Sequence, residues 1–202
     1  MRRLSLLIVF LLLSACAGPQ PIERAQPVNA ASAVFAAGCF WCVEQAFEKV
    51  PGVAQAVSGY TGGTTVNPTY EEVSGEGTGH YEAVRVIYDP EVVSYAQLLE
   101  VFWKNVDPFD PSGQFCDKGS SYRGAIFPAT AQETAAAEAS KEAVARRFGR
   151  PVDVQVLPAA TFYDAETYHQ DYYLKNPQTY AFYKWRCGRA QRLEDLWGPA
   201  AE

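Results

Sequence analysis

The sequence lacks any run of basic residues, and this argues against a nucleic-acid partner. Its 202 residues include 17 Lys and Arg against 23 Asp and Glu, so the formal net charge is −6. Proteins that bind nucleic acids need clustered cations to neutralise phosphate groups. An acidic balance mainly favours solubility. We therefore expect no nucleic-acid partner.

A second Cys-x-x-Cys pair is also missing. Cys39 and Cys42 form the one such pair in the chain. A structural zinc site needs four ligands, which two pairs of this kind usually supply. The histidines, His80 and His169, do not stand beside the remaining cysteines. We therefore expect no metal site.

No hydrophobic run near the N-terminus is long enough to cross a bilayer as a helix. The apolar stretch from Leu4 to Leu13 covers ten residues, whereas a spanning helix needs about 20. Arg2 and Arg3 precede it, and Leu13-Ser14-Ala15-Cys16 ends it with small residues. A basic start, a short apolar core and a small-residue cleavage site are typical of an export signal.

The cysteine at the end of this signal resembles the modified residue of a bacterial lipobox. The resemblance implies that Cys16 becomes the lipid-bearing first residue, which would anchor the chain to a membrane without spanning it. Ala17 follows, and the absence of Asp there implies sorting to the outer membrane, facing the periplasm. The alternative is an ordinary secretory signal with an incidental cysteine.

The domain organisation follows from composition. We expect a signal peptide at residues 1–15, a flexible small-residue and proline-rich tether at 16–32, and a single catalytic domain at 33–202. The domain would include a C-terminal tail from about residue 178. A domain of this length is large enough to bury a sizeable core. We expect a monomer.

Five cysteines is an odd number for an exported protein. If Cys16 carries lipid, Cys39, Cys42, Cys116 and Cys187 remain, and four thiols allow three fully paired arrangements. Structural disulfides are the simplest expectation in an oxidising compartment, and would suit a non-enzymatic lipoprotein. A set of redox-cycling thiols is the sharper alternative.

Cys39 stands where a buried strand gives way to a helix. The apolar segment 34–37 ends at Gly38, and helical spacing follows in Val43, Ala46, Phe47 and Val50. Unpaired N–H groups and the positive end of the helix dipole gather at such a turn. Both would lower the pKa of the Cys39 thiol and favour the reactive thiolate.

The remaining pattern mixes strands and helices without strict alternation, which predicts an α+β fold. We expect a ferredoxin-like split βαβ core, with a mixed sheet covered by helices, long functional loops and an irregular C-terminal tail. Strands are expected at 53–60, 81–88, 122–127 and 152–157. Helices are expected at 95–105 after Ser94, from 131 after Thr130, and at about 169–174 with Asp164 as cap.

The Cys39–Cys42 spacing allows two redox interpretations. A thioredoxin-like dithiol also places its Cys-x-x-Cys at a strand-to-helix turn, which would make the chain a thiol–disulfide oxidoreductase. Alternatively, Cys39 is a nucleophile that another cysteine later resolves. The spacing alone does not choose between them.

The surrounding motifs resemble one family, the A-type peptide methionine sulfoxide reductases, from about Val34 to about Pro177. The motifs are long and ordered, and they include Gly38-Cys39-Phe40-Trp41, Gly59-Tyr60-Thr61-Gly62-Gly63, Asn67-Pro68-Thr69-Tyr70, Thr78-Gly79-His80-Tyr81-Glu82-Ala83 and Tyr122-Arg123. The resemblance implies reduction of protein-bound and free methionine S-sulfoxide, with no bound cofactor and an external thioredoxin-like dithiol as reductant.

The resemblance also implies site roles. Cys39 would attack the sulfoxide sulfur, and Glu82 would protonate its oxygen. The other matching positions would be Tyr70 and Tyr122 as hydroxyl donors, Phe40 and Trp41 as walls for the substrate methyl group, and Asp117 as a substrate-positioning acid. His80 would belong to the substrate-binding residues without a chemical step of its own, and shaping of its loop is the alternative.

Glu82 fits this chemistry independently. It lies in the apolar strand pattern 81–84, where burial would raise the pKa of its carboxyl and keep it neutral. A solvated strand carboxylate is the alternative.

The resolving thiol stays open among Cys187, Cys42 and Cys116. The tail around Cys187 departs from the family because it holds one cysteine and little glycine. Cys42 could reach Cys39 across one helical turn without any movement of the tail. Cys116 lies in a loop that adjoins the expected site.

Overall fold

The computed structural model describes residues 27–199. The expected signal peptide, Cys16 and most of the expected tether lie outside the described residues. The first strand, β1 (Ala31–Ala37), begins just inside the segment 16–32 that was expected to be a tether.

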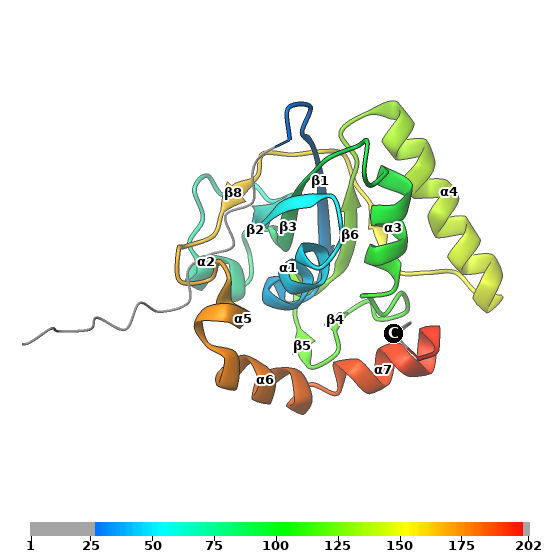
Figure 1. Ribbon diagram of the computed structural model, residues 1–202. Coiled ribbons are helices and arrows are strands. Elements are labelled where there is room, and N and C mark those ends of the chain that lie inside the picture. Colours follow the sequence, from blue (N-terminus) through cyan, green and yellow to red (C-terminus); the bar gives the residue numbers. More distant parts are fainter. Residues whose placement is uncertain (1–26, 200–202) are drawn as a thin grey trace, which may run out of the picture.

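A six-stranded sheet forms the centre of the fold, in the order β7-β6-β1-β3-β2-β8 (Figure 1). Strand β3 lies antiparallel between β1 and β2, and helix α1 connects β1 to β2. This is the expected split βαβ unit in a mixed sheet, since β7 pairs parallel to β6. The further strands are β2 (Val53–Thr61), β3 (Tyr81–Tyr88), β6 (Gly124–Phe127), β7 (Gln155–Val156) and β8 (Tyr163–Asp164), with a separate hairpin of β4 (Gly113–Gln114) and β5 (Asp117–Lys118).

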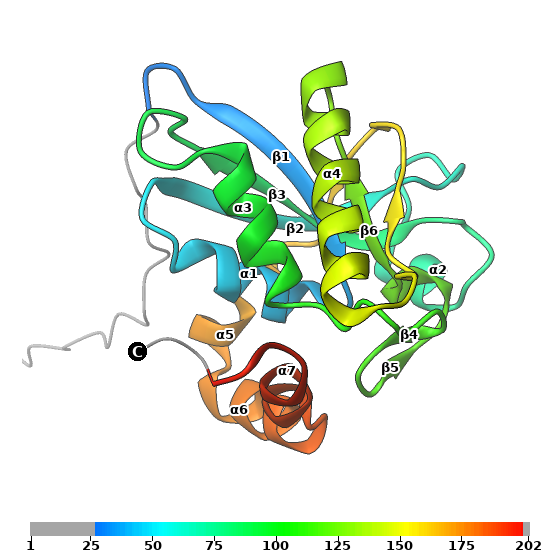
Figure 2. The same cartoon turned by 90° about the vertical axis from the view of Figure 1, so that its right-hand side faces the viewer.

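Helices cover one face of this sheet and also close one end of the molecule. Figures 1 and 2 show α1, α3 and α4 against the sheet, while α5, α6 and α7 lie together below α1. The helices are α1 (Phe40–Glu48), α2 (Tyr70–Ser74), α3 (Tyr95–Trp103), α4 (Ala131–Phe148), α5 (Tyr172–Lys175), α6 (Pro177–Arg186) and α7 (Arg189–Trp197), with a 3₁₀ turn at Ser120–Tyr122.

Phe35 is the centre of the main core, on the helix-covered face. Its ring lies 5.0 Å from that of Phe47 in α1, 5.5 Å from Phe102 and 6.1 Å from Tyr95, both in α3. The neighbouring strand residue Ala36 points to the opposite face, into a smaller cluster with Phe127. This period-two alternation shows why β1 is buried on both sides.

Two sequence expectations about the segment 152–164 were wrong. Asp164 caps no helix, because it lies in β8 and pairs with Arg85 on β3 at 2.9 Å. The strand expected at 152–157 shrinks to Gln155–Val156, because only this part pairs with the sheet edge at β6. Val152 and Val154 are nevertheless buried.

The tail expected to be irregular forms helices α6 and α7. Pro177 stands at the start of α6, where its fixed φ suits a first helical position. Gly188, with φ +63°, separates the two helices. A disulfide between Cys116 and Cys187 ties the end of α6 to the region of the β4–β5 hairpin. The helices are thus held by tertiary contacts that the residue pattern does not reveal.

Among residues 27–199, no helix combines the length and hydrophobicity needed to cross a membrane.

Replacing Phe35 tests the assignment of the main core. We expect Phe35→Ala to lower the free energy of unfolding by about 3–5 kcal/mol, because a fully buried aromatic ring leaves a cavity. Val66→Ala is the control: Val66 is 72% exposed, and we expect a change under about 0.5 kcal/mol. Urea denaturation followed by circular dichroism measures both. Similar losses in the two variants would contradict the core assignment.

Candidate active site

Cys39 occupies the expected position at the start of helix α1. It is the N-cap residue of the helix, and Gly38 before it has a φ of +82°. A Cβ atom at position 38 would lie 2.5 Å from Cβ of Gln114, so both conformation and space require glycine there. The turn from β1 to α1 therefore fixes Cys39 at the N-terminus of the helix.

Glu82 projects from β3 to the same helix terminus. One of its carboxylate oxygens accepts a hydrogen bond of 3.1 Å from the backbone N–H of Phe40, the residue after Cys39. The side chain is buried, and this burial, helped by the nearby charge of Asp117, raises the pKa of Glu82 to about 8. A carboxyl group that stays protonated at neutral pH thus lies beside Cys39.

Two half-buried phenols complete a hydrogen-bonded cluster with this acid. Tyr122 is hydrogen-bonded to both Glu82 and Tyr70. Burial, followed by the charge of Glu82, raises the pKa of both tyrosines, so they remain neutral donors. The structure therefore brings together Cys39, Glu82, Tyr70 and Tyr122 from four separate segments.

Phe40 and Trp41 diverge on either side of the helix start. Phe40 is buried and packs against the rings of Tyr60 and Tyr70. Trp41 is half-buried, and its ring stacks on Tyr172 with 3.7 Å between centroids and 5° between planes. The C-terminal segment thus covers the surface of Trp41 that was expected to face a substrate.

His169 belongs to the site, although sequence analysis gave it no role. Its Nδ1 accepts a hydrogen bond of 3.0 Å from Nε1 of Trp41, and its ring lies 4.5 Å from that of Tyr70 and 4.9 Å from that of Phe40. Since Nδ1 is the acceptor, the proton of the neutral ring sits on Nε2. Among the described residues, Nε2 is buried without a hydrogen-bond partner. It is a free donor beside Phe40 and Tyr70.

His80 lies in the glycine-rich loop, and its ring is hydrogen-bonded to the backbone of that loop. Its Nδ1 accepts a hydrogen bond of 3.1 Å from the N–H of Gly63, and its Nε2 lies 2.8 Å from the carbonyl oxygen of Thr65. Both ring nitrogens are therefore occupied by loop backbone. The structure supports the loop-shaping role and leaves no nitrogen of His80 to bind a substrate.

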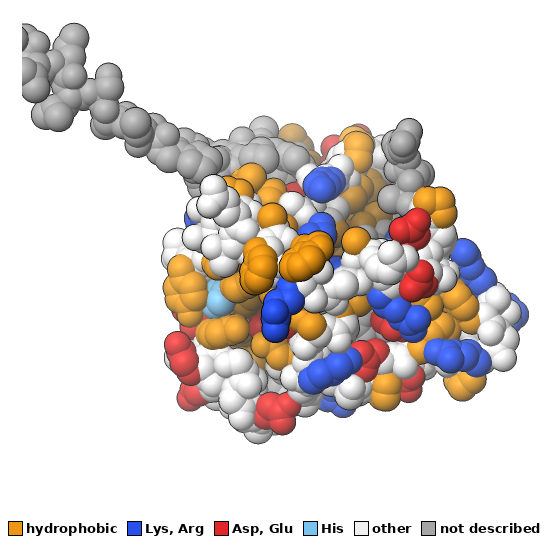
Figure 3. Space-filling view, turned by 90° about the horizontal axis from the view of Figure 1, so that it is seen from below, with side chains coloured by type: hydrophobic (Ala, Val, Ile, Leu, Met, Phe, Trp, Pro, Cys, Tyr) orange, Lys and Arg blue, Asp and Glu red, His pale blue; other side chains and the backbone are white. Residues whose placement is uncertain are grey.

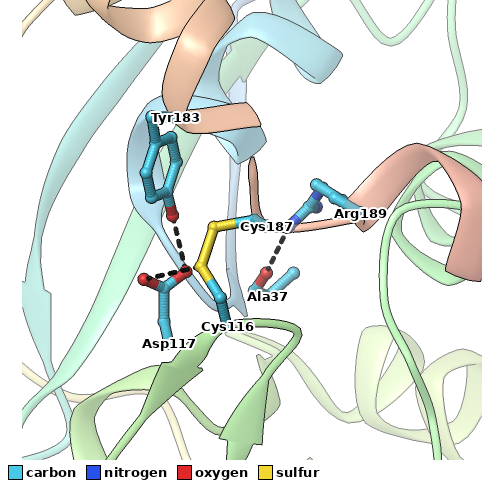
Figure 4. The surroundings of a disulfide bond; sticks show 6 residues. All are labelled: Ala37, Cys116, Asp117, Tyr183, Cys187 and Arg189. Atoms are coloured by element: carbon cyan, nitrogen blue, oxygen red, sulfur yellow. Dashed lines mark hydrogen bonds between the residues drawn. A yellow bond between two sulfur atoms is a disulfide. The ribbon is translucent and has the colours of Figure 1, made fainter. Parts of the chain in front are cut away.

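The C-terminal helix α6 covers Cys39. The hydroxyl of Tyr183 donates a hydrogen bond of 2.5 Å to Oδ2 of Asp117 and also lies within hydrogen-bond distance of the Cys39 sulfur. Cys187, one helical turn beyond Tyr183, forms the disulfide with Cys116, beside Asp117 (Figure 4). Cys39 is only 6% exposed as a result. Little of the Cys39 side chain is therefore accessible to a substrate in the described state.

The two free cysteines, Cys39 and Cys42, are hydrogen-bonded to each other. Burial raises the pKa of Cys39, contrary to the expectation that the helix terminus would lower it. The hydrogen bond from Cys39, followed by the charge of Arg189, lowers the pKa of Cys42 to about 6. A thiolate is therefore disfavoured at Cys39 and favoured at Cys42.

Two groups of side chains within the described residues have metal-ligating types, but both are already engaged. Cys116 and Cys187 of the first are joined in a disulfide. Glu44 of the second accepts hydrogen bonds from Ser58 Oγ at 2.7 Å and from the N–H of Asp171 at 2.8 Å. Neither group argues for a metal.

Comparisons with known proteins agree with this geometry. The sequence profile of the family "Peptide methionine sulfoxide reductase" matches residues 31–200. Peptide methionine sulfoxide reductase MsrA 2 of Caulobacter vibrioides is 48% identical over 198 residues, covering 98% of this chain and all of the relative. The MsrA of Bacillus subtilis is 50% identical over 168 residues, covering 82% of this chain and 95% of the relative.

Solved structures show the same fold. Reduced Mxr1 of Saccharomyces cerevisiae superposes with a TM-score of 0.72 at 29% identity, covering 77% of this chain and 90% of that one. Methionine sulfoxide reductase A of Corynebacterium diphtheriae gives 0.68 at 31% identity, covering 79% and 84%. The chain therefore belongs to the peptide methionine sulfoxide reductase family.

Proposed function

We propose that the chain reduces methionine S-sulfoxide, protein-bound and free, to methionine, with Cys39 as nucleophile and Glu82 as proton donor. The observation that carries this proposal is the placement of a protonated, buried carboxyl group at the helix terminus that holds the cysteine. A sulfoxide oxygen becomes negative when a thiolate attacks its sulfur, and such an acid can neutralise it.

The chemical step transfers the sulfoxide oxygen to the enzyme. The thiolate of Cys39 attacks the sulfoxide sulfur, Glu82 protonates the oxygen, and methionine leaves while Cys39 becomes a sulfenic acid. Sulfur of the substrate gains two electrons, and Cys39 loses them. Tyr70 and Tyr122 stabilise the oxygen by donating hydrogen bonds as neutral phenols.

Substrate entry requires α6 to move away from the site. Tyr183 occupies the space above Cys39 and engages the carboxylate of Asp117, which we propose positions the substrate. Departure of Tyr183 would expose Cys39 and remove the burial that raises its pKa. The helix terminus would then favour the thiolate. The methyl group of the substrate would lie against Phe40 and Trp41.

We propose Cys42 as the resolving thiol. It is the free cysteine hydrogen-bonded to Cys39, whereas Cys116 and Cys187 are bonded to each other. Its lowered pKa supplies a thiolate that can attack the sulfenic acid, and the departing hydroxide takes up a proton from solvent to leave as water. An external thioredoxin-like dithiol would then reduce the Cys39–Cys42 disulfide. Mxr1 of Saccharomyces cerevisiae, a structural relative, has been solved in complex with Trx2.

A second candidate function is thiol–disulfide exchange without sulfoxide chemistry. The pKa of about 6 at Cys42 favours it, because reactive dithiols of this spacing carry one acidic thiol. The alternative gives no role to Glu82, so replacement of this acid separates the two functions.

We also propose that the enzyme is lipid-anchored through Cys16, at the outer membrane and facing the periplasm. The sequence pattern Leu13-Ser14-Ala15-Cys16 supports this proposal, and Ala17 supports the final membrane. A tether between Cys16 and β1 would let the catalytic domain reach oxidised proteins near the membrane surface.

Glu82→Gln tests the proton donor. We expect a loss of about 10²–10⁴-fold in kcat for sulfoxide reduction, because the amide cannot supply the proton. In the unmodified enzyme, the protonated carboxyl prevails below pH 8 and is lost above it, so this contribution to kcat falls as pH rises through about 8. The rate of methionine formation, measured from pH 6 to 10, shows this fall in kcat. We expect the fall to be absent in Glu82→Gln.

Glu44→Gln is the matched control for that variant. Glu44 is also buried, and burial raises its pKa to about 8 as well, but its carboxylate binds Ser58 and Asp171. We expect activity within about twofold of the unmodified enzyme. If Glu82→Gln reduces sulfoxide as fast as Glu44→Gln, Glu82 is not the proton donor.

A single turnover without reductant tests the resolving thiol. We expect one methionine per enzyme and a new Cys39–Cys42 disulfide, with Cys116–Cys187 unchanged. Peptide mapping by mass spectrometry before and after the turnover identifies the bonds. A product in which Cys39 is joined to Cys187 or Cys116 would contradict the proposed route and favour a resolving thiol in the tail or its loop.

Expression of the full chain in a diderm bacterium tests the anchor. We expect the protein to incorporate a fatty-acid label and to fractionate with the outer membrane, and Cys16→Ser to abolish the label. A secreted protein without label, cleaved before position 16, would indicate the ordinary export signal.

A further inference from the structure

A cavity adjoins Cys42 on the side of the molecule formed by the C-terminal helices. Its volume is about 680 Å³, within the range of sites that hold small molecules. From α1 it is lined by Cys42, Gln45, Ala46 and Lys49, and the spacing of these residues places them along one helix face. Cys42 is thus reached from this cavity, while Cys39 lies under Tyr183.

Cations are concentrated around this cavity. Lys49, Lys104, Lys184 and Arg189 line it, and Glu194 is the one acidic residue among its described lining residues. The chain as a whole is acidic, so this is a local reversal of charge. Figure 3 shows Lys and Arg side chains among hydrophobic ones across the middle of the face that carries α6 and α7. We call the space the cationic cavity.

Two of these cations are held in place by hydrogen bonds to uncharged oxygens. Arg189 is buried, and its guanidinium donates to the carbonyl oxygens of Ala37 at 3.4 Å and Asn105 at 2.5 Å. Lys184 donates to the side-chain oxygen of Gln45 at 3.1 Å. Within the described part of the chain, none of the four ion pairs involves a cation of this cavity.

The cations of the cavity repel one another. Burial lowers the pKa of Lys184, the charge of Cys42 opposes this shift, and the positive charges of Lys49 and Arg189 lower the pKa further. Like charges placed together repel one another, and an anion bound among them relieves this repulsion. Of the two thiols Cys39 and Cys42, the thiolate of Cys42 can offset these positive charges. This negative charge is lost when Cys42 forms a disulfide, so the cations of the cavity are then left without it.

We propose that the cationic cavity binds a small anionic thiol, which reduces the Cys39–Cys42 disulfide by attacking the sulfur of Cys42. The inference rests on the proposed disulfide and adds a small-molecule route to the protein dithiol. A carboxylate-bearing thiol would occupy the cations, and its own thiolate would be favoured by the same field.

The exchange is balanced with two thiols. The first thiolate bonds to the sulfur of Cys42, the bond between Cys39 and Cys42 breaks, and Cys39 leaves as thiolate. A second thiolate attacks the sulfur of the bound small molecule, which departs as its symmetric disulfide and frees Cys42 as thiolate. The two small thiols lose two electrons, and the enzyme disulfide gains them.

Two probes with the same thiol but different charge test the proposal. Reduced glutathione carries two carboxylates, and glutathione diethyl ester carries none. The full-length protein is oxidised with diamide, and loss of the Cys39–Cys42 disulfide is followed by peptide mapping at matched thiolate concentration. We expect glutathione to react at least about tenfold faster, with a rate that saturates with concentration and an advantage that shrinks in high salt.

Charge removal locates the effect. We expect the double variant Lys49→Gln and Lys184→Gln to lose most of the glutathione advantage while it reacts with the ester at an unchanged rate. Lys141→Gln on α4, away from the cavity, should keep the full advantage. Equal rates for the two probes, or an advantage that survives in the double variant, would overturn the proposal.

The outcome is separable from that of the proposed function. Because diamide forms the disulfide directly, the cavity is tested without any sulfoxide turnover. Failure of the single-turnover experiment would refute the catalytic proposal whatever the probes show. Failure of the probe comparison alone would leave sulfoxide reduction intact and assign recycling to a protein dithiol.

Discussion

The structure of the site depends on one constraint, the N-terminus of α1. The tight turn at Gly38 places Cys39 on the helix terminus, and the first free N–H of that helix, at Phe40, binds the carboxylate of Glu82. A single hydrogen bond thus fixes the distance between nucleophile and acid. Because the acid comes from β3 and the cysteine from the end of β1, their pairing relies on the antiparallel register of these two strands.

The same terminus explains why the acid stays protonated. A helix N-terminus alone would stabilise a carboxylate and lower its pKa. Here burial outweighs that effect, so the pKa of Glu82 rises to about 8. The hydrogen bond from the N–H of Phe40, and to a smaller extent that from Tyr122, partly oppose the rise. The balance leaves a carboxyl group that can release its proton near neutral pH. A fully buried carboxyl group without these hydrogen-bond donors would keep its proton to a higher pH.

Local sequence patterns predicted the elements that build this terminus, but not what covers it. Strand β3 was expected at Tyr81–Tyr88, as observed, because alternation of apolar residues is a local signal. Helix α6 was missed because its hydrophobic residues do not form a clear stripe, and its position depends on the distant Cys116. The raised pKa of Cys39 was missed for the same reason, since Tyr183 buries it. The role of His169 depends on Trp41, 128 residues away. Contacts between residues so far apart in the sequence produce no periodic pattern in the sequence from which they could be predicted.

The two thiols of the site differ in charge because they face opposite surroundings. Cys39 is buried more deeply, and burial disfavours a thiolate there. Cys42 accepts a hydrogen bond from Cys39 and lies on the side of Arg189 and Lys184, and these contacts favour a thiolate. In the closed state these surroundings therefore favour the negative charge on Cys42, which is not the thiol proposed to attack the sulfoxide. Attack by Cys39 requires its proton to leave and Tyr183 to withdraw, so the closed tail keeps the nucleophile protonated until substrate arrives. In the proposed cycle, Cys42 lies next to the sulfenic acid as it forms, which would place resolution ahead of any further oxidation of Cys39. The different surroundings of Cys39 and Cys42 thus account for the proposed order, in which Cys39 attacks first and Cys42 resolves afterwards.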